Sequence, residues 1–271
     1  MRIAELLLEA RRAGVERLDA QLLVGHLLNR PRAWLLAHDD HALSEAQTAL
    51  LQQQLRQRAD GVPLAYLVGE REFCGLALQV TPDVLVPRPE TELLVEWVLE
   101  RLATAPASSV VDLGTGSGAI ALAVKQRWVG AAVTASDASD AALQVAQANG
   151  VRHGLAVEWL HGDWWAPLQG RRFGLAVSNP PYVAGDDPHL AALAREPRGA
   201  LTPEGDGLAA LRRIIEGARE HLLPGAWLLL EHGHDQADAV RAMLANQGFV
   251  EAQTRLDLAG LPRCTGAAWR P

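Results

Sequence analysis

The stretch Asp112-Leu113-Gly114-Thr115-Gly116-Ser117-Gly118 decides the fold, because it joins an apolar strand to a helix through a glycine-rich turn. Val110-Val111 directly precedes it and is typical of a buried strand, and residues 119–128 follow with helical spacing. Glycines at alternate positions let the backbone turn sharply and approach a ligand closely, while the next helix offers its N-terminal amides. The stretch therefore predicts a nucleoside-binding α/β unit.

Strands and helices alternate outward from this unit to the end of the chain. The sequence predicts strands over residues 131–135, 157–160, 173–177 and 226–230, helices over 140–149, 208–222 and 236–247, and extended stretches near Val250 and Ala267. This alternation predicts an α/β fold with a mostly parallel, doubly wound sheet and helices on both faces. Ligands of such sheets bind beyond the carboxyl ends of the strands, so we expect the site there.

The glycine loop alone leaves the cofactor open. Gly114, Gly116 and Ala119 also satisfy the dinucleotide fingerprint G-x-G-x-x-A. Asp137, at the exit of the next strand, suits the ribose hydroxyls of any nucleoside cofactor. NAD and S-adenosyl-L-methionine both fit these residues.

Two further features favour S-adenosyl-L-methionine, which is a cation. Asp112 stands directly before the glycine loop, where the pyrophosphate of NAD would have to approach a carboxylate. Gly162-Asp163-Trp164, at the exit of the strand over 157–160, offers an acid for an exocyclic amine and an indole for an adenine face.

The strand over 173–177 ends in Ser178-Asn179-Pro180-Pro181-Tyr182. Prolines carry no N–H, so the carbonyls of Asn179 and Pro180 lack ladder partners and are free to point into a crevice. The side-chain oxygen of Asn179 adds a third acceptor, and the Tyr182 ring lies next to it. We interpret these residues as a cradle for a planar –NH2 group; the alternative is an ordinary proline-rich strand end.

The chain divides into three predicted parts. Residues 1–62 form a small helical bundle that docks the substrate, residues 63–86 a β-hairpin connector, and residues 87–271 the domain that binds the cofactor. Ser44 and Gln47 make a capping box for a helix that ends near Asp60-Gly61. Apolar residues at helical spacing predict two buried stripes in the bundle: Leu6, Leu7 and Ala10, and then Leu18, Leu22, Leu23, Leu27 and Leu28.

In the connector, the apolar residues alternate over Tyr66-Leu67-Val68 and again over Leu76-Ala77-Leu78-Gln79-Val80, with glycines at 69 and 75. This alternation predicts the two strands of the hairpin.

Composition excludes several classes of protein. The net charge of −7, with Lys125 as the sole lysine, argues against stable binding to nucleic acid. Cys74 and Cys264 have no metal-ligand spacing, so we expect no metal site and two reduced thiols in a cytoplasmic protein. No run of eighteen apolar residues is present, which predicts no membrane span and no signal peptide. We expect a monomer.

The glycine loop followed at the fourth strand by Asn179-Pro180-Pro181-Tyr182 resembles the signature of class I, Rossmann-like methyltransferases that act on planar nitrogen. Pro87-Arg88-Pro89-Glu90-Thr91-Glu92 and the N-terminal bundle make the chain similar to the HemK/PrmC family over essentially its whole length. The resemblance implies methylation of the glutamine side chain in the Gly-Gly-Gln tripeptide of peptide-chain release factors.

The resemblance also implies the roles of individual residues. Asn179 and Pro180 are expected to be catalytic, and Asp163 and residues 87–92 to make further contacts. Substrate-binding residues are Asn179, Pro180, Pro181 and Tyr182; cofactor-binding residues are Gly114, Thr115, Gly116, Ser117 and Gly118 at the methionine end, Asp137 at the ribose, Trp164 at the adenine, and Asn179.

Four other functions compete with this one. A nucleic-acid amino-group methyltransferase would meet the same planar –NH2 but must flip a base and grip phosphates, which suits an acidic chain poorly. A glutamine methyltransferase of a ribosomal protein would need the same cradle. A nicotinamide-dependent oxidoreductase or a non-enzymatic binding module would leave the cradle without a purpose.

Overall fold

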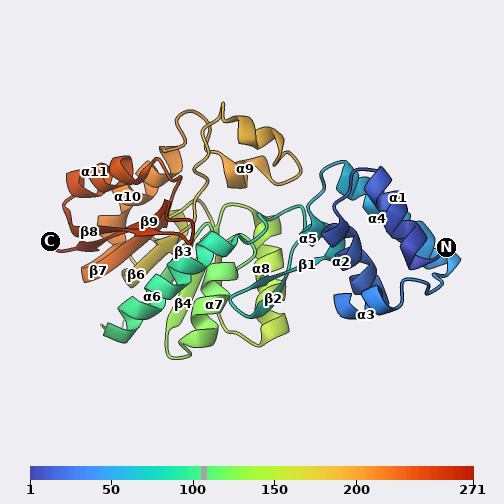
Figure 1. The fold of residues 1–271 in the computed structure, drawn as a ribbon. Coiled ribbons are helices and arrows are strands. Elements are labelled where there is room, and N and C mark those ends of the chain that lie inside the picture. Colours follow the sequence, from blue (N-terminus) through green and yellow to red (C-terminus); the bar gives the residue numbers. More distant parts are fainter. Residues whose placement is uncertain (105–108) are drawn as a thin grey trace. The chain divides into compact units, whose positions relative to one another are not determined.

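The computed structural model describes residues 1–104 and 109–271. The chain forms two compact units, Met1–Glu70 and Arg71–Pro271, each with a hydrophobic core. Figure 1 shows helices throughout the first unit and a sheet with helices in the second. The predicted boundaries at residues 62 and 86 stay predictions.

The first unit contains five helices among the described residues: α1 (Ile3–Arg12), α2 (Arg17–Leu28), α3 (Arg32–Ala37), α4 (Glu45–Ala59) and α5 (Leu64–Val68). Their apolar faces meet around Leu6, Leu23 and Leu51, which are fully buried. The predicted capping box is confirmed at the start of α4, where the backbone amide of Gln47 donates to Ser44 Oγ at 3.2 Å and that of Ser44 donates to Gln47 Oε1 at 2.9 Å.

Two predictions for this unit are wrong. Leu18 and Leu22 are 46% and 40% exposed, because α2 is apolar around most of its circumference and buries the face of Ala20, Leu23 and Val24 instead. Tyr66-Leu67-Val68 is helical rather than extended: α5 begins after Pro63 and ends at Gly69, which adopts φ +82°. A five-residue apolar run cannot separate the two periods.

The second unit is built on a seven-stranded sheet of order β5-β4-β3-β6-β7-β9-β8. The strands β3 to β7 run parallel, and β8 and β9 are antiparallel additions at one edge. Their bounds are β3 (Ser109–Leu113), β4 (Ala132–Asp137), β5 (Glu158–His161), β6 (Phe173–Ser178), β7 (Leu222–Glu231), β8 (Phe249–Leu256) and β9 (Pro262–Trp269). The predicted doubly wound sheet is confirmed. A separate two-stranded sheet pairs β1 (Glu70–Phe73) with β2 (Leu76–Gln79).

Helices cover both faces of the large sheet, as Figure 1 shows. One face packs on α6 (Glu92–Thr104) and α7 (Ala119–Arg127), the other on α10 (Ala209–His221) and α11 (Ala237–Asn246). Successive strand residues alternate between the two cores: Val110 lies in the first and Val111 in the second. The remaining elements are η1 (Pro89–Thr91), α8 (Asp140–His153), η2 (Ala166–Leu168), η3 (Pro188–Ala191) and α9 (Arg198–Leu201).

Strand register determines which residues meet at the carboxyl edge of the sheet. Leu113 pairs with Ser136 on one side and Ser178 on the other, and Ser178 pairs with Leu230. The next residues along these strands are Gly114, Asp137, Asn179 and Glu231. The chain therefore presents its glycine loop, an acid, the cradle asparagine and a second acid side by side.

In the parts of the chain that the structure describes, no helix combines the length and the apolarity needed to cross a bilayer. The same residues hold no group of three or more His, Cys, Asp or Glu side chains placed to bind a metal ion.

Candidate active site

A cavity of about 380 Å³ opens at the carboxyl ends of β3, β4, β5 and β6. It brings together residues that the sequence analysis selected from four separate strand exits: Gly114, Thr115, Gly116, Ser117, Asp137, Asp163, Trp164, Asn179 and Pro181. Gly118, Pro180 and Tyr182 are not among the residues that line it.

The glycine loop is shaped for close approach. Gly114 and Gly116 have φ of +71° and +56°, conformations that residues with a Cβ rarely adopt. A Cβ on Gly114 would lie 3.0 Å from the Trp164 ring, so the indole lies directly against the loop at the cavity wall. The loop and the indole therefore both form part of the cavity wall, and the indole makes that part apolar.

Gly118 serves packing rather than the cavity. A Cβ there would lie 3.0 Å from Trp159 and 3.2 Å from the Ala146 side chain of α8, so these neighbours would have to move to accommodate it. The residue also adopts φ +82° as the N-cap of α7. Its place in the predicted cofactor set stays a prediction that no cavity contact supports.

The Asp137 carboxylate is held in place by backbone amides and can accept further hydrogen bonds. Its Oδ2 accepts from the Gly116 amide at 2.8 Å and its Oδ1 from the Ser139 amide at 2.9 Å. The Ala138 amide adds a third donor, and because a carboxylate has about four acceptor positions, Asp137 can still accept from a further donor such as a ribose hydroxyl. Burial raises the pKa of Asp137 above its ordinary value, while these amides lower it.

Asp112 lies behind the glycine loop and not in the cavity. It is 1% exposed; its Oδ2 accepts from the Thr115 hydroxyl at 2.6 Å and from the Ala121 amide at 3.2 Å. Burial raises its pKa to about 7, and its Oδ1 has no hydrogen-bond partner among the described residues. Asp112 therefore holds the loop against α7, and the argument that it faces a cationic ligand is not supported by its position.

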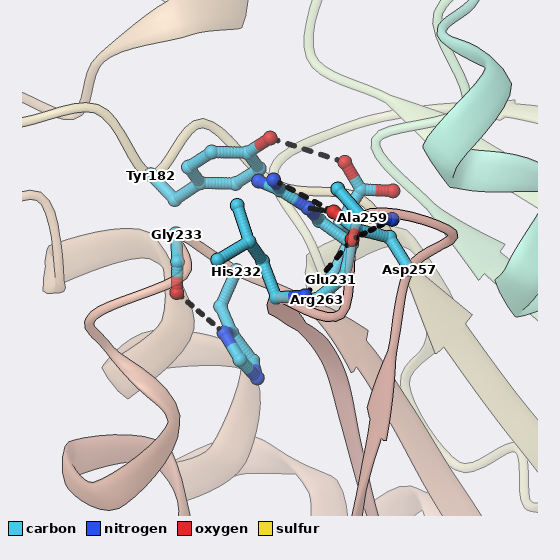
Figure 2. A network of polar contacts seen from close by, with 8 residues as sticks. Tyr182, Glu231, His232, Gly233, Asp257, Ala259 and Arg263 are labelled. Carbon is cyan, nitrogen blue, oxygen red and sulfur yellow. Dashed lines mark hydrogen bonds and ion pairs between the residues drawn. The ribbon is translucent and has the colours of Figure 1, made fainter.

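The cradle residues separate into two environments. Asn179 lines the cavity, and its Nδ2 donates to Thr91 Oγ1 at 3.0 Å, which leaves Oδ1 as the acceptor. Tyr182 instead donates its hydroxyl to Glu231 Oε1 at 3.1 Å, as Figure 2 shows, and its carbonyl accepts from Gln236 Nε2 at 2.9 Å. The hydrogen bonds of Tyr182 therefore hold residues 179–182 in place through partners that do not line the cavity.

Two further segments contribute to the cavity lining: Asp83, Val84, Leu85, Pro87, Arg88 and Thr91 from the first, and Pro197, Gly199 and Ala200 from the second. The two segments are tied by Glu196, which is 7% exposed, pairs with the Arg88 guanidinium and accepts from the Val86 amide at 3.1 Å. The sequence analysis selected residues 87–92 but missed Glu196 and residues 197–200, because an isolated acid in a proline-containing loop carries no pattern.

Comparison with known proteins agrees with this geometry. The family described as PrmC N-terminal domain matches residues 1–69, and the family described as Methyltransferase small domain matches residues 90–254. The chain is 52% identical over 256 residues to the release factor glutamine methyltransferase of Bordetella pertussis, covering 93% of this chain and 95% of that one. The chain belongs to the release factor glutamine methyltransferase family.

Other members of this family match as fully. The enzyme of Coxiella burnetii is 44% identical over 91% of this chain and 90% of its own, and that of Salmonella typhimurium is 40% identical over 94% and 93%. The family uses S-adenosyl-L-methionine.

Solved structures confirm the Rossmann-like methyltransferase fold. The hMettl16 catalytic domain, solved with a 3′UTR hairpin, superposes with a TM-score of 0.60 at 15% identity and covers 80% of this chain and 83% of that one. The 16S rRNA methyltransferase of T. thermophilus, solved with AdoMet and guanosine, superposes with a TM-score of 0.57 at 23% identity. The match covers 74% of this chain and 50% of that one.

Proposed function

We propose that this protein transfers a methyl group from S-adenosyl-L-methionine to the side-chain amide nitrogen of the glutamine in the Gly-Gly-Gln tripeptide of peptide-chain release factors. The observation that carries the proposal is Asn179, whose nitrogen is tied to Thr91 while its oxygen remains an acceptor at the wall of the cavity. The family to which the chain belongs supports the choice of substrate.

The cavity fits the cofactor. Gly114 to Ser117 would hold its methionine end, Asp137 its ribose and the Trp164 indole its adenine, because these residues form one continuous wall. When bound, S-adenosyl-L-methionine supplies an electrophilic methyl group on a sulfonium.

The protein's own contribution is to accept hydrogen bonds and to position the substrate. An amide nitrogen is a poor nucleophile because its lone pair is delocalised, and positive charge grows on it as it attacks. Acceptors aimed at its hydrogens therefore stabilise the transition state more than the ground state. Asn179 Oδ1 is proposed for this role. The Pro180 carbonyl is proposed as a second acceptor on the family resemblance alone, since Pro180 is not among the residues that line the cavity. Holding the reactants in line lowers the entropic barrier. No strong base is needed, since the proton becomes acidic only after transfer.

Replacing the acceptor tests the proposal. Asn179→Ala should lower kcat by roughly 100- to 1,000-fold, the usual loss for one electrostatic partner of the transition state. Asn246→Ala, at an exposed position at the end of α11, is the matched control and should leave kcat unchanged. A near-normal rate for Asn179→Ala would show that the cradle is not catalytic.

The substrate is tested with intact release factor, whose Gln→Ala variant at the tripeptide should accept no methyl group. Ribosomal protein and ribosomal RNA serve as competing acceptors in the same assay. Methylation of either in preference to release factor would replace the proposal with one of the two alternatives that share the cradle. The net charge of −7 disfavours the nucleic-acid acceptor.

We further propose that residues 1–62 dock the release factor. Apolar side chains on the surface of the first unit support this role: Leu8, Leu18, Leu22, Leu36 and Leu50 are 40–55% exposed. Removing residues 1–61 should raise KM for whole release factor and leave the cofactor Kd intact. Loss of cofactor binding on truncation would instead make the unit structural.

A further inference from the structure

Glu231 is a buried acid that the proposed reaction does not use directly. It ends β7, is 1% exposed and is not among the residues that line the cavity. Its Oε1 accepts from the Tyr182 hydroxyl at 3.1 Å (Figure 2). Its Oε2 is buried and has no hydrogen-bond partner at ordinary distance among the described residues. A buried acceptor of this kind is costly unless a donor is at hand.

Thr91 is the donor that its surroundings offer. This residue is 5% exposed, and its hydroxyl oxygen accepts from Asn179 Nδ2 at 3.0 Å. The same hydroxyl lies close enough to the Glu231 carboxyl to lower the pKa of that group. A hydroxyl has one proton, and with the Asn179 bond accepted that proton is free to be donated. The Thr91 hydroxyl therefore has a proton to donate, and Glu231 Oε2 has lone pairs free to accept it.

We propose that Glu231 is a positioning residue that fixes the orientation of the Asn179 amide through the Thr91 hydroxyl. An ionised carboxylate only accepts, so Thr91 must donate to it and must then accept from Asn179 Nδ2. Asn179 Oδ1 is thereby kept as the acceptor at the cavity. The inference rests on the proposed function and adds what holds its acceptor in place.

Protonation of Glu231 would remove this constraint. A neutral carboxyl can donate to Thr91, whose proton can then turn to Asn179, and the amide can reverse to present its –NH2 to the cavity. The –NH2 group of Asn179 would then face the –NH2 group of the substrate glutamine, and Asn179 would no longer offer an acceptor to it. Because an amide reverses with almost no change of shape, only the direction of the hydrogen bonds selects one orientation.

The charges around Glu231 come from several elements. Arg263 on β9 favours the ionised form, whereas Glu90 on η1 opposes it. Tyr182 and Cys264 also face the carboxyl, and burial raises the pKa of both. Asp257 accepts from Arg263 at 3.1 Å and so holds the guanidinium in place (Figure 2). Burial outweighs these partners and raises the pKa of Glu231 to about 7.

The test compares Glu231→Gln with Thr91→Val. Each should lower kcat by roughly 10- to 100-fold, the loss expected for a reversed buried hydrogen bond, with an unchanged cofactor Kd by calorimetry. The double variant should lose no more than the stronger single variant, because both act through one path. Glu158→Gln, at an exposed ion pair with Arg171, is the control and should change nothing. Thr91→Val removes one hydroxyl only, so it carries the test if Glu231→Gln does not fold.

The pH profile separates positioning from a merely structural role. Wild-type kcat should rise with pH through a midpoint near the Glu231 pKa of about 7, and Glu231→Gln and Thr91→Val should both lose this limb. A limb retained in both variants, or full kcat in Thr91→Val, would overturn the proposal.

A second readout needs no turnover. In ¹⁵N-labelled protein the side-chain NH2 resonances of Asn179 should move as Glu231 titrates in the wild type and stay fixed in Thr91→Val. Asn179 resonances that ignore pH in the wild type would overturn the proposal. If they follow Glu231 while no glutamine is ever methylated, the proposed function fails and the positioning role stands.

Discussion

Replacing Asp112 by Asn should stabilise the protein in a strongly pH-dependent way. Asp112 is 1% exposed, and burial raises its pKa from the ordinary value of 3.8 to about 7. Between about pH 4 and pH 7, Asp112 is therefore protonated in the native state and ionised in the unfolded state. It follows that the wild-type free energy of unfolding falls as pH rises from about 4 to about 7 and then levels off.

The size of the effect comes from the two pKa values of Asp112. Each unit of difference is worth about 1.4 kcal/mol, so the ionised carboxyl costs the native state up to about 4 kcal/mol above pH 7. An Asn side chain carries no charge and can still accept from Thr115 and the Ala121 amide. The Asn –NH2 would take the place of Oδ1, which has no partner, and this adds a cost that does not depend on pH. The stability of the variant relative to the wild type should therefore rise by up to about 4 kcal/mol between pH 4 and pH 8.

Urea unfolding at several pH values measures this difference. Trp34 is the one tryptophan of the first unit, so intrinsic fluorescence reports chiefly on the second unit, where Asp112 lies. Other titrating groups, including Glu231 with its own pKa of about 7, cancel when the variant is compared with the wild type at each pH. A difference in stability that is the same at pH 4 and pH 8 would refute the reasoning.

Two further predictions concern packing and thiol reactivity. Gly118→Ala should lose roughly 1–3 kcal/mol more stability than Gly116→Ala in urea unfolding, because both positions have positive φ but only at Gly118 would a Cβ meet Trp159 and Ala146; equal losses would contradict the packing argument. Cys74 and Cys264 should react with a thiol reagent at about pH 8 only after unfolding, because burial raises the pKa of Cys74 to about 12 and raises that of Cys264 as well; labelling of either thiol in the native protein would contradict this.

The sheet was predictable because its signals are local. The strands β3 and β6 are short, mostly apolar runs that are followed at once by a predicted site residue, Gly114 after Ser109–Leu113 and Asn179 after Phe173–Ser178. The predictions for α2 and α5 are wrong because the apolar pattern of each segment fits more than one arrangement. In α2 most positions are apolar, so spacing could not choose between the face of Leu23 and that of Leu18. In α5 the flanking Pro63 and Gly69 decided the conformation, not the apolar alternation.

Within the site, the sequence selected the strand exits but not the direction of each side chain. Asp112 lies next to the last residue of β3 and Asp137 is the last residue of β4, yet Asp112 is buried behind the glycine loop and Asp137 lines the cavity. Tyr182 stays a predicted substrate contact, and the sequence offers no sign that its hydroxyl donates to Glu231. Within a strand, successive side chains point to opposite faces of the sheet, but this alternation ends where the strand becomes a loop. The direction of an acid at a strand end therefore cannot be predicted from its position in the sequence.

The two buried acids point to a common principle in how this site is held. Asp112 on β3 accepts from the Thr115 hydroxyl beneath the glycine loop, and Glu231 on β7 stands beside the Thr91 hydroxyl beneath Asn179. In each case a group that only accepts, once ionised, dictates the direction of a threonine hydroxyl and through it the shape of a loop. The cost is the raised pKa of both acids, which removes stability at neutral pH. Asp112→Asn should therefore separate the two quantities: stability near pH 8 rises, while cofactor affinity falls because an amide can donate as well as accept, so the direction of the Thr115 hydroxyl is no longer fixed.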